Sequence, residues 1–111
     1  SLKIDTEKKI EQSRRIVKCL AYLKSRFDCE LILAGDLNLL PNTESIKIIE
    51  DFGLRNLITE YEITSTRTTH YKKPLQHADY IFVSDGVEVN DFSILPDVVS
   101  DHAPLQLVFS I

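Results

Sequence analysis

The apolar positions in the first quarter of the chain repeat with the period of an α-helix. Between residues 5 and 27 they recur at steps of four, three and four residues, which places them on one side of a helix. The stripe consists of Ile16, Leu20, Leu23 and Phe27. Asp5 or Thr6 has the short polar side chain that favours a helix N-cap. The pattern predicts an amphipathic helix that packs on a sheet.

A second helix is predicted after Pro41, with its start at Asn42 or Thr43. Its inward positions are Ile46, Ile49 and Phe52. Gly53 is the expected stop, because glycine readily adopts the left-handed conformation that ends helices.

Two strands are predicted from runs without helical period. Residues 31–34 form a continuous apolar run bounded by Gly35, as in a central strand buried on both faces. Residues 64–71 are rich in threonine and contain no glycine, which favours a second strand.

Three further strands are predicted towards the C-terminus. Residues 80–83 and 87–92 flank Ser84-Asp85-Gly86, a sequence typical of a hairpin turn. Residues 105–111 alternate in side-chain character, which predicts a last strand with one more apolar face.

These elements place the chain in the α/β class, with helices on one face of a mixed β-sheet. The composition of the 111 residues, 43% hydrophobic and 27% charged, is that of one compact globular unit. The other sheet face is left open, and its strands are apolar. We therefore expect self-association or a further protein segment on that face.

Charge is distributed unevenly along the chain. Residues 1–28 carry eight Lys or Arg against four acidic residues, whereas residues 29–111 carry five against thirteen. The basic residues of the first helix are Lys8, Lys9, Arg14, Arg15 and Lys18. They fit a solvated helix face better than a nucleic-acid contact, because no aromatic residues are interleaved with them.

Cysteines and long apolar runs give no sign of an oxidising or membrane environment. Cys19 and Cys29 lack a metal-ligand spacing, and we interpret them as reduced structural thiols rather than a disulfide. No run approaches the roughly 18 apolar residues that span a bilayer, and the first residues lack a signal-peptide segment. An intracellular location is expected.

Three short polar motifs lie beside the apolar runs. Gly35-Asp36-Leu37-Asn38 follows one strand, Asp79-Tyr80 opens another, and Ser100-Asp101-His102 precedes the last. Polar residues at strand ends gather at one rim of a sheet, where a rigid scaffold commonly holds functional loops. Each motif alone also fits a turn, since Asp and Asn favour that geometry. Together they predict an active site.

In this order the motifs resemble the endonuclease/exonuclease/phosphatase family, the metal-dependent phosphoesterases of the DNase I type. The family signatures appear as Gly35-Asp36-Leu37-Asn38, His77-Ala78-Asp79-Tyr80 and Ser100-Asp101-His102. The resemblance covers nearly the whole chain but only the C-terminal half of a family domain. It implies that residues 1–111 are half of a four-layer α/β/β/α sandwich, without the Asn and the metal-binding Glu of the N-terminal half.

The resemblance also implies a role for each motif residue. Asp36 orients and deprotonates the attacking water, and Asn38 donates a hydrogen bond to that water or to the phosphoryl group. His102 contacts the scissile phosphate, while Asp79 hydrogen-bonds the far nitrogen of its ring. Asp101 and Asp36 help to hold a divalent cation. Oxygen ligands suit Mg²⁺ or Mn²⁺, and the chain offers no Cys/His cluster for zinc.

Candidate substrate contacts precede the Asp79-Tyr80 motif. His70 and Tyr71 lie in the segment where relatives often place substrate-facing Thr and Tyr residues. His77 stands where relatives often have a basic residue, and a neutral His would attract phosphate more weakly. The substrate stays open among nucleic acids, nucleotides, inositol phosphates and sugar-phosphate lipids.

We therefore expect a metal-dependent phosphoesterase, either a nuclease or a phosphatase, of which this chain holds part of the active site. The alternative is a non-catalytic half-domain that acts as a binding or interaction module. The missing Glu favours the module. The enzyme is favoured by the complete rim of Asp36, Asn38, Asp79, Asp101 and His102.

Overall fold

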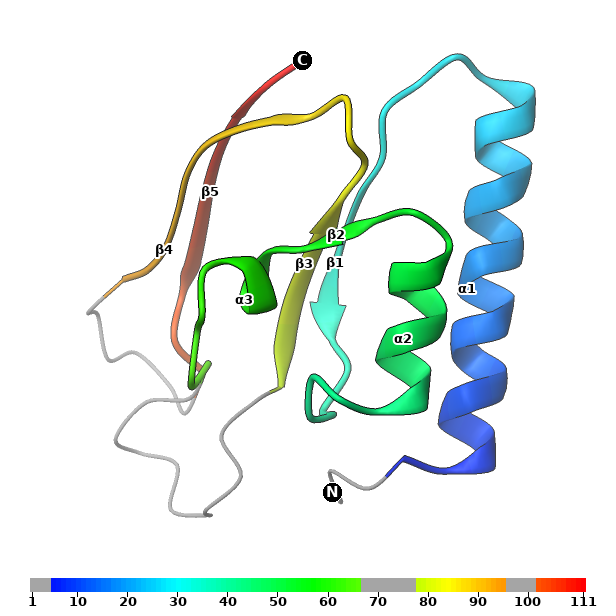
Figure 1. The fold of residues 1–111 in the computed structure, drawn as a ribbon, viewed down its shortest axis with the longest axis horizontal. Coiled ribbons are helices and arrows are strands. Elements are labelled where there is room, and N and C mark those ends of the chain that lie inside the picture. Colours follow the sequence, from blue (N-terminus) through cyan, green and yellow to red (C-terminus); the bar gives the residue numbers. More distant parts are fainter. Residues whose placement is uncertain (1–4, 67–77, 96–101) are drawn as a thin grey trace.

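The structure, a computed structural model, describes residues 5–66, 78–95 and 102–111. In chain order its elements are α1 (Glu7–Arg26), β1 (Ile32–Asp36), α2 (Glu44–Asp51), β2 (Arg55–Asn56), α3 (Leu57–Glu60), β3 (Asp79–Val83), β4 (Glu88–Ile94) and β5 (Leu105–Ser110). Helices α1 and α2 pack together at one side, β4 and β5 lie at the other, and β1, β2 and β3 run between them (Figure 1). The predicted α/β class is confirmed.

Helix α1 lies where its apolar stripe predicts. Thr6 is the N-cap, and its side chain accepts a backbone hydrogen bond from the first turn at 3.2 Å. Leu20 is buried, and Ile16 and Leu23 pack against the core. The prediction for Phe27 is wrong: its side chain is 55% exposed. Its backbone is already extended, so the helical step no longer keeps it on the stripe.

Helix α2 is fixed at both ends by residues outside it. Asp5, a candidate cap for α1, caps α2 instead, because its carboxylate accepts hydrogen bonds from the backbone N–H of Ser45 at 3.0 Å and from the Ser45 hydroxyl. Thr43 is the N-cap position by backbone conformation. Gly53 follows the helix with φ of +116°, the conformation expected of a glycine stop.

The described strands form two antiparallel sheets. The first has the order β1-β3-β2, and the second pairs β4 with β5. The predicted hairpin between residues 80–83 and 87–92 is wrong, because β2 occupies the edge of β3 and β4 pairs with β5. The turn between them is still closed by a hydrogen bond from the Val87 N–H to the Ser84 carbonyl, at 3.0 Å.

Strand β3 has one fully buried face and a second face that is open from Asp79 to Ile81 and closed at Val83, which is 0% exposed. Tyr80 and Phe82 are each 1% exposed and join the isoleucines of α2 in the core. On the other face, Ile32 of β1 is 40% exposed and Ile81 is only partly buried. The prediction that residues 31–34 are buried on both faces is therefore wrong, because no described element covers the face that carries Ile32 and Ala34. The predicted central position is also wrong for the described strands, among which β1 lies at the edge of its sheet.

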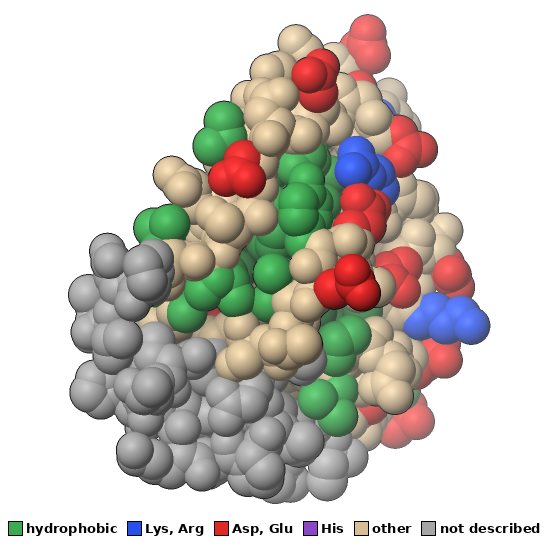
Figure 2. All heavy atoms as spheres, turned by 60° about the vertical axis from the view of Figure 1, so that its left-hand side comes forward, with side chains coloured by type: hydrophobic (Ala, Val, Ile, Leu, Met, Phe, Trp, Pro, Cys, Tyr) green, Lys and Arg blue, Asp and Glu red, His purple; other side chains and the backbone are tan. Residues whose placement is uncertain are grey.

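Apolar side chains are also exposed on β5. Val108 and Phe109 are each 44% exposed. Figure 2 shows hydrophobic side chains along the middle of the view in which the β4–β5 side comes forward, with acidic side chains beside them. Apolar surface of this kind is a frequent sign of an interaction site when it is contiguous.

Three remaining expectations concern other parts of the chain. Residues 64–66 are not a strand, and the rest of the segment 64–71 lies outside the described residues. Cys19 and Cys29 are free thiols. Among the described helices, none is both long and apolar enough to cross a membrane.

Candidate active site

Two aspartates face each other at one end of the β1–β3 ladder. Asp36 is the last residue of β1 and Asp79 the first of β3, and the antiparallel register pairs them directly. Opposite residues in such a pair project from the same face of the sheet, a few ångströms apart. That face is the open one, since Tyr80 and Phe82 occupy the other. Two like charges in this position repel each other unless a cationic or proton-donating group lies between them.

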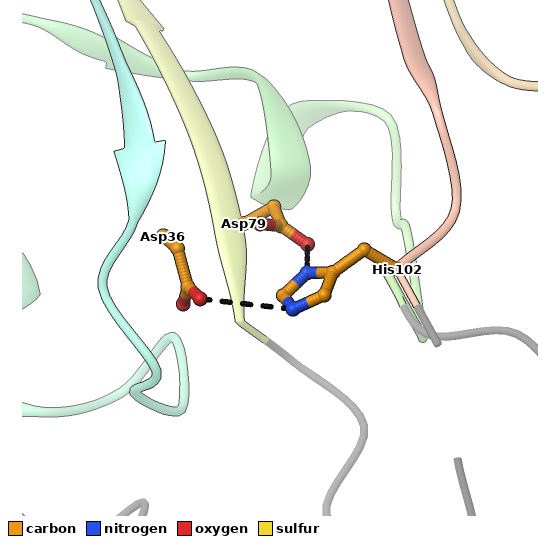
Figure 3. Close-up of side chains that lie close together, drawn as sticks. All are labelled: Asp36, Asp79 and His102. Carbon is orange, nitrogen blue, oxygen red and sulfur yellow. Dashed lines mark hydrogen bonds and ion pairs between the residues drawn. The ribbon is translucent and has the colours of Figure 1, made fainter. Parts of the chain in front are cut away.

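His102 supplies a group between the two carboxylates (Figure 3). Its Nδ1 lies 2.7 Å from Oδ2 of Asp79, and its Nε2 lies 3.7 Å from Oδ2 of Asp36. An ionised carboxylate only accepts hydrogen bonds, so Nδ1 carries the proton in that contact. A protonated ring turns a second N–H towards Asp36, whereas a neutral ring directs its Nε2 lone pair there.

The two carboxylates differ in exposure. The side chain of Asp79 is 21% exposed and that of Asp36 is 48% exposed, with His102 intermediate at 35%. Asp79 is therefore suited to orient the ring, and Asp36 is suited to meet an incoming molecule. A small group such as water, placed beside the 3.7 Å gap, can be hydrogen-bonded by both Asp36 and the Nε2 of His102.

The three side chains line a hollow on the open face. Its volume is about 310 Å³, and its wall is Ala34, Gly35, Asp36, Asp79, Tyr80, Ile81, His102, Ala103 and Leu105. A larger hollow of about 630 Å³ lies along α1, lined by Glu7, Lys8, Glu11, Gln12 and Arg15. We assign the chemistry to the smaller hollow, because polar groups converge there around an apolar wall.

Comparison with known families decides the relationship. A model described as the endonuclease/exonuclease/phosphatase family matches residues 8–102, which is most of the chain and includes all three clustered residues. The chain belongs to the endonuclease/exonuclease/phosphatase family. No curated protein matches the sequence.

A solved structure shows the same fold. It is a mannosyl-6-phosphatase of Bacteroides thetaiotaomicron, with a TM-score of 0.81 and 19% sequence identity over 98% of this chain. The chain spans 48% of that protein, about half of its length. At this identity the likeness concerns the fold, and the mannosyl-6-phosphatase activity is that of the neighbour.

The loop after β1 is fixed mainly through its backbone. The N–H groups of Leu37 and Asn38 both donate to the Ala78 carbonyl, at 2.8 and 3.1 Å. The Tyr80 hydroxyl donates to the Leu39 carbonyl at 2.5 Å. Burial, with a smaller contribution from the charge of a neighbouring glutamate, raises the pKa of Tyr80, so the hydroxyl stays a donor. Asn38 has φ of +48°, a conformation that asparagine tolerates better than most residues.

Lys9 also reaches this loop, which corrects the interpretation of the basic helix face. Its Nζ donates to the Asn38 carbonyl at 3.3 Å, and the residue is partly buried. The other four basic residues of that set are exposed, as a solvated face requires. The helical pattern of apolar and polar positions identifies Lys9 only as a polar residue. Nothing in the neighbouring sequence therefore distinguishes it from Lys8.

The predicted residues divide into three groups. Asp36, Asp79 and His102 come together, as the motifs predicted, and the Asp79–His102 contact has hydrogen-bond length. Asn38 lies two residues beyond Asp36 in the fixed loop. Four candidates lie outside the described residues: His70, Tyr71, His77 and Asp101. Thr66, whose hydroxyl accepts a hydrogen bond from the backbone of Asp79, was missed.

The cluster has the composition of a small metal site. One ligand atom from each of Asp36, Asp79 and His102 lies within 4.8 Å of the others. Nδ1 and one oxygen of Asp79 are already joined to each other, so a cation that used both would break that hydrogen bond. A hard divalent cation fits Asp36 better, because this carboxylate is accessible from the hollow and such ions retain water ligands.

Proposed function

We propose that the protein is a phosphoric ester hydrolase and that Asp36, Asp79 and His102 form the catalytic part of its site. The observation that carries the proposal is the imidazole held between two carboxylates, 2.7 Å from one and 3.7 Å from the other, in a family of phosphoesterases. A partly buried acid that fixes one ring nitrogen leaves the other available to substrate, the usual logic of such pairs.

The reaction is a displacement at phosphorus by water. Asp36 accepts a proton from the water as its oxygen bonds to phosphorus, and the bond to the ester oxygen breaks, with the electron pair and a proton from solvent going to the leaving alcohol. The Nε2–H of a protonated His102 donates to a phosphoryl oxygen, and Asp79 holds the ring in that orientation. The amide of Asn38 donates to the same developing charge. Such preorganised donors supply most of the catalysis in phosphoryl transfer.

A divalent cation would complete this chemistry. Mg²⁺ or Mn²⁺ would be held by Asp36 and Asp101 and, when bound, would neutralise charge on the phosphoryl oxygens. The preference over zinc rests on carboxylate donors and the lack of a cysteine and histidine cluster in the sequence.

The 111 residues are proposed to be the C-terminal half of a family domain. Supporting this, the structural match takes in 98% of this chain but only 48% of the phosphatase with the same fold. The other half would cover the open face beside Ile32 and bring the metal-binding Glu. Without it we expect hydrolysis to be slow or undetectable. The binding-module alternative draws on the same exposed apolar face.

The substrate class is tested by a panel. The chain, alone and joined to an N-terminal half-domain of the family, is assayed with Mg²⁺ and Mn²⁺ against DNA, RNA, inositol phosphates, a phosphorylated mannoside and simple phosphate esters. The proposal predicts turnover of at least one class that Asp36→Ala removes. His70→Ala, Tyr71→Ala and His77→Ala test the proposed substrate contacts, with a change in KM as the expected effect. Turnover in no class, or turnover that Asp36→Ala leaves intact, favours the binding module.

A further inference from the structure

A buried threonine outside the family motifs bonds the second motif directly and connects to the other two through neighbouring backbone groups. Thr66 is fully buried, at 0% exposure, in the segment that follows α3. Its Oγ1 accepts hydrogen bonds from the backbone N–H groups of Ala78 and Asp79, at 2.9 and 3.1 Å. Its carbonyl accepts one from the N–H of Ala103, at 2.9 Å. One residue thereby contacts the start of β3 and the residue next to His102.

The connection continues to the loop after β1. Ala78, whose N–H is held by Thr66, uses its own carbonyl to accept the N–H groups of Leu37 and Asn38. In Figure 1 the segment after α3 runs down to the end of the molecule where β3 begins and the chain enters β5. A hydrogen-bonded path therefore runs from Ala103 through Thr66 and Ala78 to the loop that follows Asp36.

The geometry of Asp79 and His102 depends on this path. Asp79 begins β3, whereas His102 lies shortly before β5 of the other sheet, and the 2.7 Å contact between Oδ2 and Nδ1 joins their side chains. Thr66 fixes the backbone of both partners, since it bonds the Asp79 N–H itself and the N–H adjacent to His102. Backbone shifts of about 1 Å are enough to lose a hydrogen bond of this kind and to cost about a hundredfold in rate.

We propose that Thr66 is a positioning residue that sets the Asp79–His102 contact. It touches neither substrate nor cation, and acts through the two backbone segments that carry the pair. A hydroxyl is required because its oxygen has two lone pairs and serves two N–H groups at once. The branched side chain also has few rotamers, which keeps the oxygen in place. The effect on turnover rests on the proposed function, whereas the effect on geometry does not.

Nuclear magnetic resonance of the 111-residue chain labelled with ¹⁵N-histidine tests the geometry directly. Thr66→Val keeps the shape but removes the acceptor, Thr66→Ser keeps the acceptor, and Thr64→Val is the control at an exposed threonine nearby. We expect a hydrogen-bonded Nδ1–H resonance of His102 in the unmodified protein and in the Ser and control variants. Thr66→Val should lose it while still unfolding cooperatively. A folded Thr66→Val that keeps the resonance would overturn the proposal.

Amide hydrogen exchange of the unmodified protein covers the case in which Thr66→Val does not fold. The N–H groups of Ala78, Asp79 and Ala103 should be protected and should open together, because one residue holds all three. Unprotected exchange at Ala78 and Asp79, or independent opening of Ala103, would overturn the proposal.

Turnover by the chain joined to an N-terminal half-domain, which is the form expected to be active, separates this inference from the proposed function. Thr66→Val should lower kcat about a hundredfold with KM changed less than about threefold, and Thr66→Ser should restore most of the rate. If the unmodified protein hydrolyses no ester but Thr66→Val loses the His102 resonance, the proposed function fails and the positioning role stands. If the unmodified protein is active and folded Thr66→Val is equally active, the positioning role fails and the function stands.

Discussion

Successive residues of strand β3 point to opposite faces of the sheet, and the two faces contribute differently to the core and to the candidate site. Tyr80 and Phe82 point into the core, each 1% exposed. Asp79 and Ile81 point to the open face, where Asp79 meets His102 and both residues line the hollow. Between Asp79 and Phe82 the alternation of the strand thus places core packing on one face and the polar site on the other, while Val83 at the end of the strand is buried on the second face. Substitutions on the two faces should have separable effects.

Removal of a core ring is expected to have the largest effect. Phe82→Ala should lower the free energy of unfolding by about 3 to 5 kcal/mol, because it leaves a cavity in a fully packed site. Ile32→Ala is the control on the open face, where a 40% exposed side chain should cost less than about 1 kcal/mol. Denaturant unfolding measures both. Equal losses would show that the two faces are not distinct.

Removal of the exposed carboxylate should leave folding intact and abolish turnover. Asp36→Ala is expected to cost about 3 to 4 kcal/mol of transition-state stabilisation in the active form, the loss typical of one preorganised group. Stability should be unchanged or slightly higher, because Asp36 faces Asp79 directly in the register. Asp91→Ala, an exposed acidic residue on β4, is the control. Kinetics and unfolding are measured on the same preparations, and a fully active Asp36→Ala would contradict the assignment.

The apolar open face should promote self-association of the isolated chain. Ile32→Lys is expected to weaken it by about 1 to 2 kcal/mol per dimer, since each copy would otherwise bury a half-exposed side chain. Sedimentation equilibrium over a range of concentrations gives the dissociation constant. The control is Tyr22→Lys, which changes a 59% exposed residue of α1. A wild-type chain that stays monomeric at high concentration would count against an apolar docking face.

The smallest effect is expected at a partly exposed ion pair outside the candidate site. Arg55 donates to both carboxylate oxygens of Glu60, at 2.8 and 3.0 Å, and this hydrogen bonding lowers the pKa of Glu60. A lowered folded-state pKa stabilises the protein above the unfolded-state value, and that contribution is lost as the pH falls through the folded-state value. Glu60→Gln should reduce this loss of unfolding free energy at acidic pH by less than about 1 kcal/mol, because solvent screens the ion pair.

The control for that measurement is Glu62→Gln, at an exposed acid in the following segment. It removes one acidic charge but keeps the Arg55–Glu60 pair, so it measures the effect of losing a charge alone. If the unfolding free energy falls equally with acidic pH in the wild type and in Glu60→Gln, the ion pair makes no measurable contribution to stability.

The features that the sequence predicted well are local ones. Helices α1 and α2 follow from apolar period and from caps at their ends, whereas the four-residue α3 was not predicted. Asp36, Asp79 and His102 follow from short motifs at strand ends. A strand end fixes where a side chain emerges. Because β1 and β3 pair in antiparallel register, Asp36 and Asp79 at their ends lie opposite each other.

The features that it predicted wrongly depend on distant neighbours. The hairpin failed because the two residues of β2, which give no periodic signal, pair with β3. The prediction that β1 is buried on both faces failed because an apolar run does not show whether another element packs on each face of the sheet. Thr66 and Lys9 were missed because their partners are backbone groups far along the chain, and backbone groups have no sequence signature.

The most direct test of the central claim is ester hydrolysis in H₂¹⁸O by the chain joined to an N-terminal half-domain of the family, with Mg²⁺ or Mn²⁺, beside matched His102→Ala and Asp91→Ala variants. The account predicts one ¹⁸O atom in the phosphoryl product, full activity in Asp91→Ala, and a loss of about a hundredfold or more in His102→Ala. Hydrolysis that persists unchanged in His102→Ala, or no ¹⁸O incorporation from any ester, would contradict it.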